Sequence, residues 1–70
     1  MRISDLRERI TLSFGQSWAP SFSSDIALSE LDSKTVNEAL SAGFEPDVIW
    51  KAVCKAHPVQ TENIGISNAN

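Results

Sequence analysis

The chain has 70 residues, 41% of them hydrophobic and 21% charged, which is typical of one small soluble globular domain. Its single cysteine, Cys54, excludes a disulfide-stabilised secreted domain, and no apolar run approaches the roughly 20 residues that span a bilayer. The net charge of −3 argues against a protein that binds polyanions by neutralising phosphates.

The N-terminal segment predicts a helix over residues 5–14, because its apolar residues recur at helical spacing and share one face. These residues are Ile3, Leu6, Ile10 and Phe14. Ser4 is expected to cap the helix and Gly15 to end it. Residues 1–9 are charged where a signal peptide would be apolar, so we expect a cytoplasmic protein.

A second helix is expected from about residue 18 to residue 28. The apolar stripe that indicates it consists of Trp18, Phe22 and Ile26. Ser17 is a suitable cap, and Pro20 fits such a helix only in its first turn. The chain then passes into a tight connection over residues 32–34.

The third helix has the clearest start signal. Thr35 and Glu38 match a capping box, in which each side chain accepts a hydrogen bond from the backbone N–H of the other residue. Gly43 supplies a left-handed stop, so this helix has about two turns. Its buried face is expected to consist of Val36, Ala39 and Leu40.

The fourth helix is expected to begin at Pro46, whose fixed φ suits the first helical position, and to end at His57-Pro58. The residues that follow are polar and show no helical stripe. We therefore expect one helical domain over residues 1–59 and a disordered tail over residues 60–70.

These four short helices predict an all-α fold, a compact bundle in which the third and fourth helices form a helix-turn-helix-like pair. The turn of that pair falls at residues 43–45. The predicted core consists of Leu6, Ile10, Phe14, Phe22, Leu28, Leu31, Val36, Leu40, Ile49, Trp50 and Val53.

Several short runs together carry a resemblance to a known family. They are residues 28–31, 35–43, Pro46 and 49–54, with Met1-Arg2, Phe14-Gly15, Trp18 and Asp25. The chain thereby resembles a family of short actinobacterial proteins known as domain of unknown function 3046. The similarity covers about residues 1–59 without a gap, and residues 35–54 are its most specific part.

The resemblance implies a compact helical fold and an actinobacterial source. It implies no activity, ligand or catalytic residue. Relatives are often encoded near a DNA recombinase and its regulator, which suggests a link to DNA repair or recombination. The chain departs from the family pattern at Pro20, 32–33, Lys34 and His57.

No set of residues in the sequence indicates catalysis. Cys54 and His57 stand three apart on one predicted helix, but a third group to orient the histidine is not evident. We expect Cys54 to pack in the core and His57 to lie at the surface. Asp25, Glu30 and Asp32 lack the pattern of a calcium loop. We therefore predict no enzyme, metal or cofactor.

The helix-turn-helix-like pair raises the possibility of DNA binding. The N-terminal residues of the recognition helix would face the bases and phosphates. In this chain those residues include Glu45 and Asp47, whose carboxylates repel phosphates. An accessory DNA-binding protein is accordingly the second hypothesis rather than the first.

The two tryptophans leave another alternative open. Core packing is the default for both Trp18 and Trp50, although so small a domain can hardly bury two completely. The alternative is that one, with Trp50 favoured, anchors a partner, with Lys51 and Lys55 as its polar rim. The leading hypothesis is thus a small non-enzymatic module that binds an unidentified protein or associates with itself.

Overall fold

The computed structural model describes residues 1–62, which form helices and no strand beyond one isolated bridge. In chain order the elements are α1 (Ile3–Phe14), α2 (Ala19–Asp25), the 3₁₀ helix η1 (Ser29–Leu31), α3 (Val36–Ser41), α4 (Pro46–Ala56) and α5 (Pro58–Thr61). The predicted all-α fold is confirmed. It includes two short helices, η1 and α5, that the sequence analysis did not predict.

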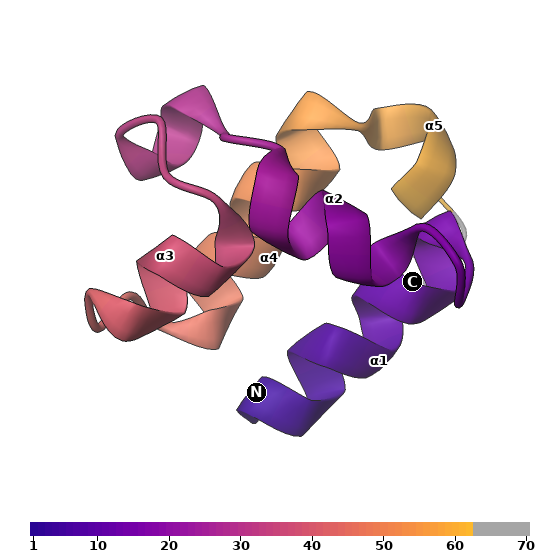
Figure 1. Cartoon of the computed structure of the whole chain (residues 1–70), viewed down its shortest axis with the longest axis horizontal. Helices are drawn as coiled ribbons and strands as arrows, with labels where there is room; N and C mark the ends of the chain where they lie inside the picture. The colour runs from indigo at the N-terminus through magenta and orange to yellow at the C-terminus, as the bar shows by residue number, and fades with distance from the viewer. Residues whose placement is uncertain (63–70) are drawn as a thin grey trace.

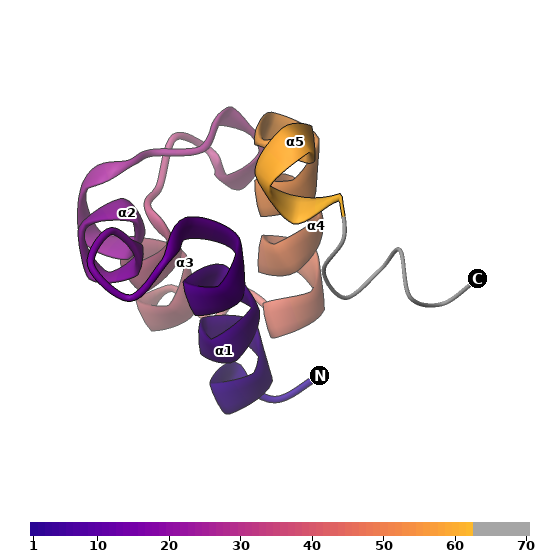
Figure 2. The ribbon, with the colours of Figure 1, turned by 90° about the vertical axis from the view of Figure 1, so that its right-hand side faces the viewer.

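The helices pack mainly around α1 and α4. Helix α1 contacts α2, α4 and α5, while α3 contacts α2 and α4 (Figure 1). Figure 2 shows α2 on one side of the molecule and α4 with α5 on the other, with α1 between them. The 3₁₀ helix η1 packs against α4. No helix is covered on all sides, so each needs only one apolar face.

The core brings one face of every long helix together. Its buried hydrophobic residues are Leu6, Ile10, Ala19, Phe22, Leu28, Leu31, Val36, Ala39, Ile49, Trp50, Ala52 and Val53. Phe14 and Leu40, which the periodicity placed in the core, are only partly buried against it. Three alanines also lie there, and one of them, Ala39, was predicted on the buried face of the third helix. Small side chains at helix contacts let short helices approach closely.

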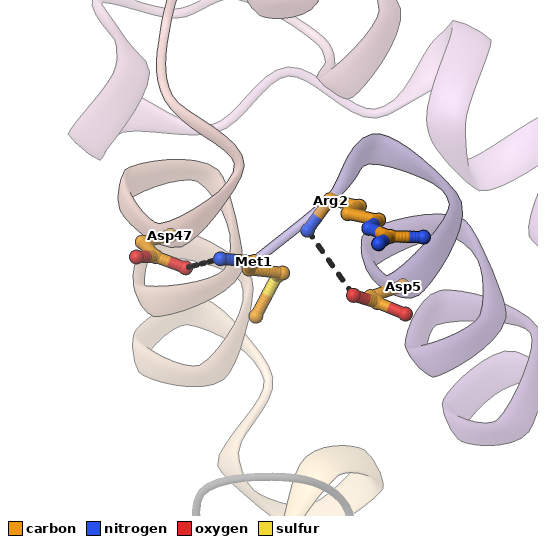
Figure 3. A network of polar contacts seen from close by, with 4 residues as sticks. All are labelled: Met1, Arg2, Asp5 and Asp47. Atoms are coloured by element: carbon orange, nitrogen blue, oxygen red, sulfur yellow. Dashed lines mark hydrogen bonds and ion pairs between the residues drawn. The ribbon is translucent and has the colours of Figure 1, made fainter.

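The first helix begins earlier than predicted. Asp5 accepts a hydrogen bond at its Oδ2 from the backbone N–H of Arg2, at 3.1 Å (Figure 3). This contact fixes Arg2 as the residue before the helix, so Ser4 lies inside α1 instead of capping it. A carboxylate in the first turn also interacts favourably with the helix dipole.

The second helix is shorter than predicted, because the chain turns back on itself after Asp25. Leu28 donates its backbone N–H to the carbonyl oxygen of Lys34 at 3.0 Å and forms the isolated bridge with it. Asp32 and Ser33 both have positive φ angles, 58° and 64°, and these permit the reversal. The predicted tight connection at residues 32–34 is therefore confirmed, with η1 in front of it.

The capping box at the start of α3 forms as predicted. Thr35 donates its backbone N–H to Glu38 Oε1 at 2.9 Å, and Glu38 donates its own to Thr35 Oγ1 at 3.1 Å. Gly43 follows the helix with φ +92°, a conformation that glycine adopts at no steric cost. A helix of six residues depends on such end contacts, since its own hydrogen bonds are few.

Replacing Thr35 with alanine is expected to lower the free energy of unfolding by about 1 kcal/mol, because the Glu38 N–H loses its acceptor. Urea denaturation followed by far-UV circular dichroism measures this loss. Thr11→Ala is the matched control, since the Thr11 hydroxyl bonds only to the Arg7 carbonyl within α1. An equal loss in both variants contradicts the capping role.

The last described helix extends the domain beyond its predicted end at residue 59. Pro58 ends α4 as expected, but it also occupies the first position of α5. Thr61 is only 4% exposed and donates its hydroxyl to the carbonyl oxygen of His57 at 2.8 Å. Residues 60 and 61 are thus helical and not part of a disordered tail. Residues 63–70 of the predicted tail lie outside the described residues.

Candidate functional site

Trp50 belongs to the interior. It is 1% exposed and lies on the face of α4 that packs into the core, with the Arg9 guanidinium 5.8 Å from its ring centre. The sequence analysis placed this tryptophan in the predicted core, which is confirmed, and favoured it over Trp18 only in the alternative of a surface anchor. Its burial argues against the anchor role. Trp50 is buried because the apolar face of α4 is wide enough to include position 50 beside positions 49 and 53.

Trp18 is the tryptophan at the surface. It is 47% exposed and immediately precedes α2, so the helical stripe that grouped it with Phe22 does not include it. The residues around it in the chain, Gln16, Ser17 and Pro20, are exposed as well. The structure therefore confirms Trp50 as a core residue, and the exposed tryptophan is Trp18, not the one favoured as a possible anchor.

The two predicted rim lysines lie on the outer side of α4. Lys55 places its Nζ 3.4 Å from Glu30 Oε2, an ion pair between α4 and η1. Lys51 borders two surface hollows. The first hollow, of about 200 Å³, is also lined by Val48 and Lys55. The second, of about 190 Å³, lies between α1 and α4. Of these two hollows, Trp50 lines only the second and Lys55 only the first, so the three predicted residues do not line one hollow together.

A larger hollow, of about 390 Å³, lies between α1 and α2. It is lined by Arg7, Ile10, Thr11, Gln16, Ala19, Pro20 and Ser23. Arg7 donates from Nη2 to Asn37 Oδ1 at 3.0 Å, and this bond ties α1 to α3. No residue pattern in the sequence indicates this hollow, because it depends on how the two helices cross.

Cys54 and His57 have separate structural roles. The His57 ring packs edge-on against Phe14 and Phe22, with ring centres 5.4 and 5.3 Å apart, and the two phenylalanines stack at 4.1 Å. His57 is therefore half-buried, not at the surface as predicted. Cys54 is also partly buried. Among residues 1–62, no three His, Cys, Asp or Glu side chains gather closely enough to hold a metal ion.

Burial raises the pKa of the Cys54 thiol, and the polar Thr61 side chain and the charge of Arg9 offset this only in part. A raised pKa lowers the thiolate fraction. We therefore expect iodoacetamide at pH 7.5 to alkylate the folded protein at least about three times more slowly than the urea-unfolded chain. The folded-state rate should rise with pH up to that raised pKa. Faster reaction in the folded protein contradicts this account and indicates an activated thiol.

The predicted helix-turn-helix-like pair corresponds to α3 and α4, which contact each other. Phe44 lies between them, partly buried, and donates its backbone N–H to the Ala39 carbonyl at 3.0 Å. The N-terminus of α4 presents Glu45 and Asp47, both exposed. Asp47 lies 3.5 Å from the amino group of Met1 (Figure 3). The end of this helix that would enter a DNA groove therefore carries carboxylates.

Comparisons with known proteins place the chain in a family. No helix among the described residues has the length and hydrophobicity needed to cross a membrane. No curated protein and no solved structure is similar enough to count as a match. Residues 1–61 match one family, described as a protein of unknown function (DUF3046). The chain belongs to this DUF3046 family, as the residues quoted from positions 1–54 suggested.

Proposed function

We propose that this protein is a small non-enzymatic module that binds another protein, with Trp18 as its anchor. The exposure of Trp18 is the observation that supports this most. A tryptophan left 47% exposed keeps a large apolar ring in water, an unfavourable arrangement that a partner can relieve. Tryptophan is also among the residues that contribute most to binding energy at protein interfaces.

The surroundings of Trp18 resemble the centre of a small interface. Its neighbours in the chain are polar or constrained: Gln16, Ser17 and Pro20, all exposed. Such residues form a rim around an aromatic anchor in many interfaces. The turn that carries Trp18 is held at both ends by backbone hydrogen bonds, Gly15 N–H to Thr11 O at 2.7 Å and Ala19 N–H to Gly15 O at 2.9 Å. Little order would have to be gained on binding.

The charges favour a protein partner over DNA. A DNA-binding role for α3 and α4 would bring Glu45 and Asp47 towards phosphates. The non-enzymatic part of the proposal is supported by Cys54, whose raised pKa disfavours the reactive thiolate. It is further supported by His57, whose ring packs against two phenylalanines.

Affinity capture with three forms of the protein tests the proposal. Wild type, Trp18→Ala and Val48→Ala are immobilised and exposed to lysate of the native host. Val48 is the control because its side chain is also 47% exposed but lies on α4. We expect a specific protein to be retained by wild type and Val48→Ala, and about tenfold less by Trp18→Ala, as for an interface hot spot. A photo-crosslinker at position 18 should label the same protein.

Two further measurements complete the test. Sedimentation equilibrium shows whether the partner is a second copy, in which case Trp18→Ala abolishes the dimer and Val48→Ala does not. Titration with a DNA duplex at physiological salt examines the second hypothesis. Retention of every partner by Trp18→Ala, or salt-dependent duplex binding with no protein retained, overturns the proposal.

A further inference from the structure

The hollow between α1 and α4 is lined by an unusual set of polar groups. Besides Met1 and Asp47, it is bordered by Arg9, Trp50 and Lys51. A guanidinium, an indole and an ammonium group can all donate hydrogen bonds, and none of them can accept one. Side chains that only donate are complementary to a ligand that only accepts.

Trp50 provides an independent observation. Its Nε1 is buried and has no hydrogen-bond partner, the only such side-chain atom among the described residues. Leaving a buried donor unpaired costs stability, so an N–H group of this kind in a folded protein calls for an explanation. A ligand oxygen that enters the hollow provides the missing acceptor.

The charge of the hollow also favours an anion. Among residues 1–62, neither Arg9 nor Lys51 forms an ion pair with a carboxylate. Asp47, the one carboxylate that lines the hollow, lies 3.5 Å from the amino group of Met1 (Figure 3). Two cations thus face the same space in a protein whose net charge is −3.

We propose that this hollow binds a small oxyanion, a carboxylate or phosphate group, through Arg9, Lys51 and the indole N–H of Trp50. The Arg9 guanidinium lies 5.8 Å from the centre of the Trp50 ring, and both residues border the hollow. The volume of about 190 Å³ suits an ion or a single acidic group and not a whole cofactor. This site needs no protein partner and is independent of the role of Trp18.

Titrations with sodium phosphate and sodium succinate at pH 7 test the site, with sodium chloride at matched ionic strength as the reference. Isothermal calorimetry and amide NMR shifts of residues 9 and 50–51 report binding. We expect saturable binding of at least one oxyanion and none of chloride. Phosphate alone indicates a phosphorylated ligand, and succinate alone indicates a carboxylate ligand.

The variants distinguish a built site from general attraction of anions. Lys51→Gln and Arg9→Gln should weaken binding about tenfold, because each removes a charged donor. Lys55→Gln is the matched control, one turn further along α4 and paired with Glu30, and should weaken it less than about twofold. Trp50→Phe keeps a ring but removes the N–H, and should weaken binding several-fold while the fold is retained. Equal effects of Lys51→Gln and Lys55→Gln, or no saturable binding of either oxyanion, overturn the proposal.

Discussion

Trp50→Ala is expected to lower the free energy of unfolding by about 4 kcal/mol, which is a large part of the total stability of so small a domain. Trp50 is the largest of the fully buried side chains, and its removal leaves a cavity bordered by α1 and α4. A domain of this length has a total stability of only about 4–10 kcal/mol. Urea denaturation followed by far-UV circular dichroism measures the loss.

Trp18→Ala is the control for the same residue type. Because Trp18 is half-exposed, its removal opens no cavity, and we expect a loss below about 1 kcal/mol. The loss in the free energy of unfolding for Trp50→Phe should fall between those of the two alanine variants, since the smaller ring leaves a smaller void and removes the unpaired N–H group. Similar losses in the two alanine variants contradict the assignment of Trp50 to the core and Trp18 to the surface.

Local rules predicted a good part of this fold. The capping box of Thr35 and Glu38, the stop at Gly43 and the start of α4 at Pro46 all depend on residues within a few positions of one another. Such contacts are present in the sequence itself, because the helix ends need particular hydrogen-bond partners and φ angles. The all-α class followed from them and from the apolar spacing.

The two tryptophans show what periodicity cannot decide. Trp18 and Trp50 each fall on an apolar stripe, so spacing alone assigns both to the core. Whether Trp18 is buried depends on where α2 begins, and this in turn depends on how the chain turns after Gly15. Pro20 fits several positions of a first turn, so the sequence does not determine where α2 begins.

The surface hollows and α5 required the three-dimensional arrangement. The hollow between α1 and α4 joins Arg9 to Lys51, residues 42 positions apart in sequence, through helix packing that no short pattern encodes. Pro58 was read as the end of one helix, which is correct, but the same residue begins α5. The burial of Thr61 stabilises that helix, and a polar residue gives no hydrophobic signal.

Phe22→Ala is the second variant with a large expected effect, a loss of about 3–4 kcal/mol in the free energy of unfolding. Phe22 is 1% exposed, stacks on Phe14 at 4.1 Å and supports the edge of His57 at 5.3 Å. His57 immediately precedes α5. Removing the ring should therefore loosen α5 in addition to destabilising α2, an effect on two helices that are distant in sequence.

Phe22→Leu separates packing from ring contacts. Leucine fills most of the space and keeps the site apolar, so we expect a loss of about 1–2 kcal/mol, part of it from the lost aromatic pairs. Hydrogen exchange of the Thr61 amide, which donates to His57 O at 3.3 Å, reports on α5. Exchange there should quicken more in Phe22→Ala than in Phe22→Leu, relative to the amides of α3. If Thr61 and α3 respond alike in both variants, the aromatic cluster does not hold α5 in place, and α5 depends instead on its contacts with α1 and α4.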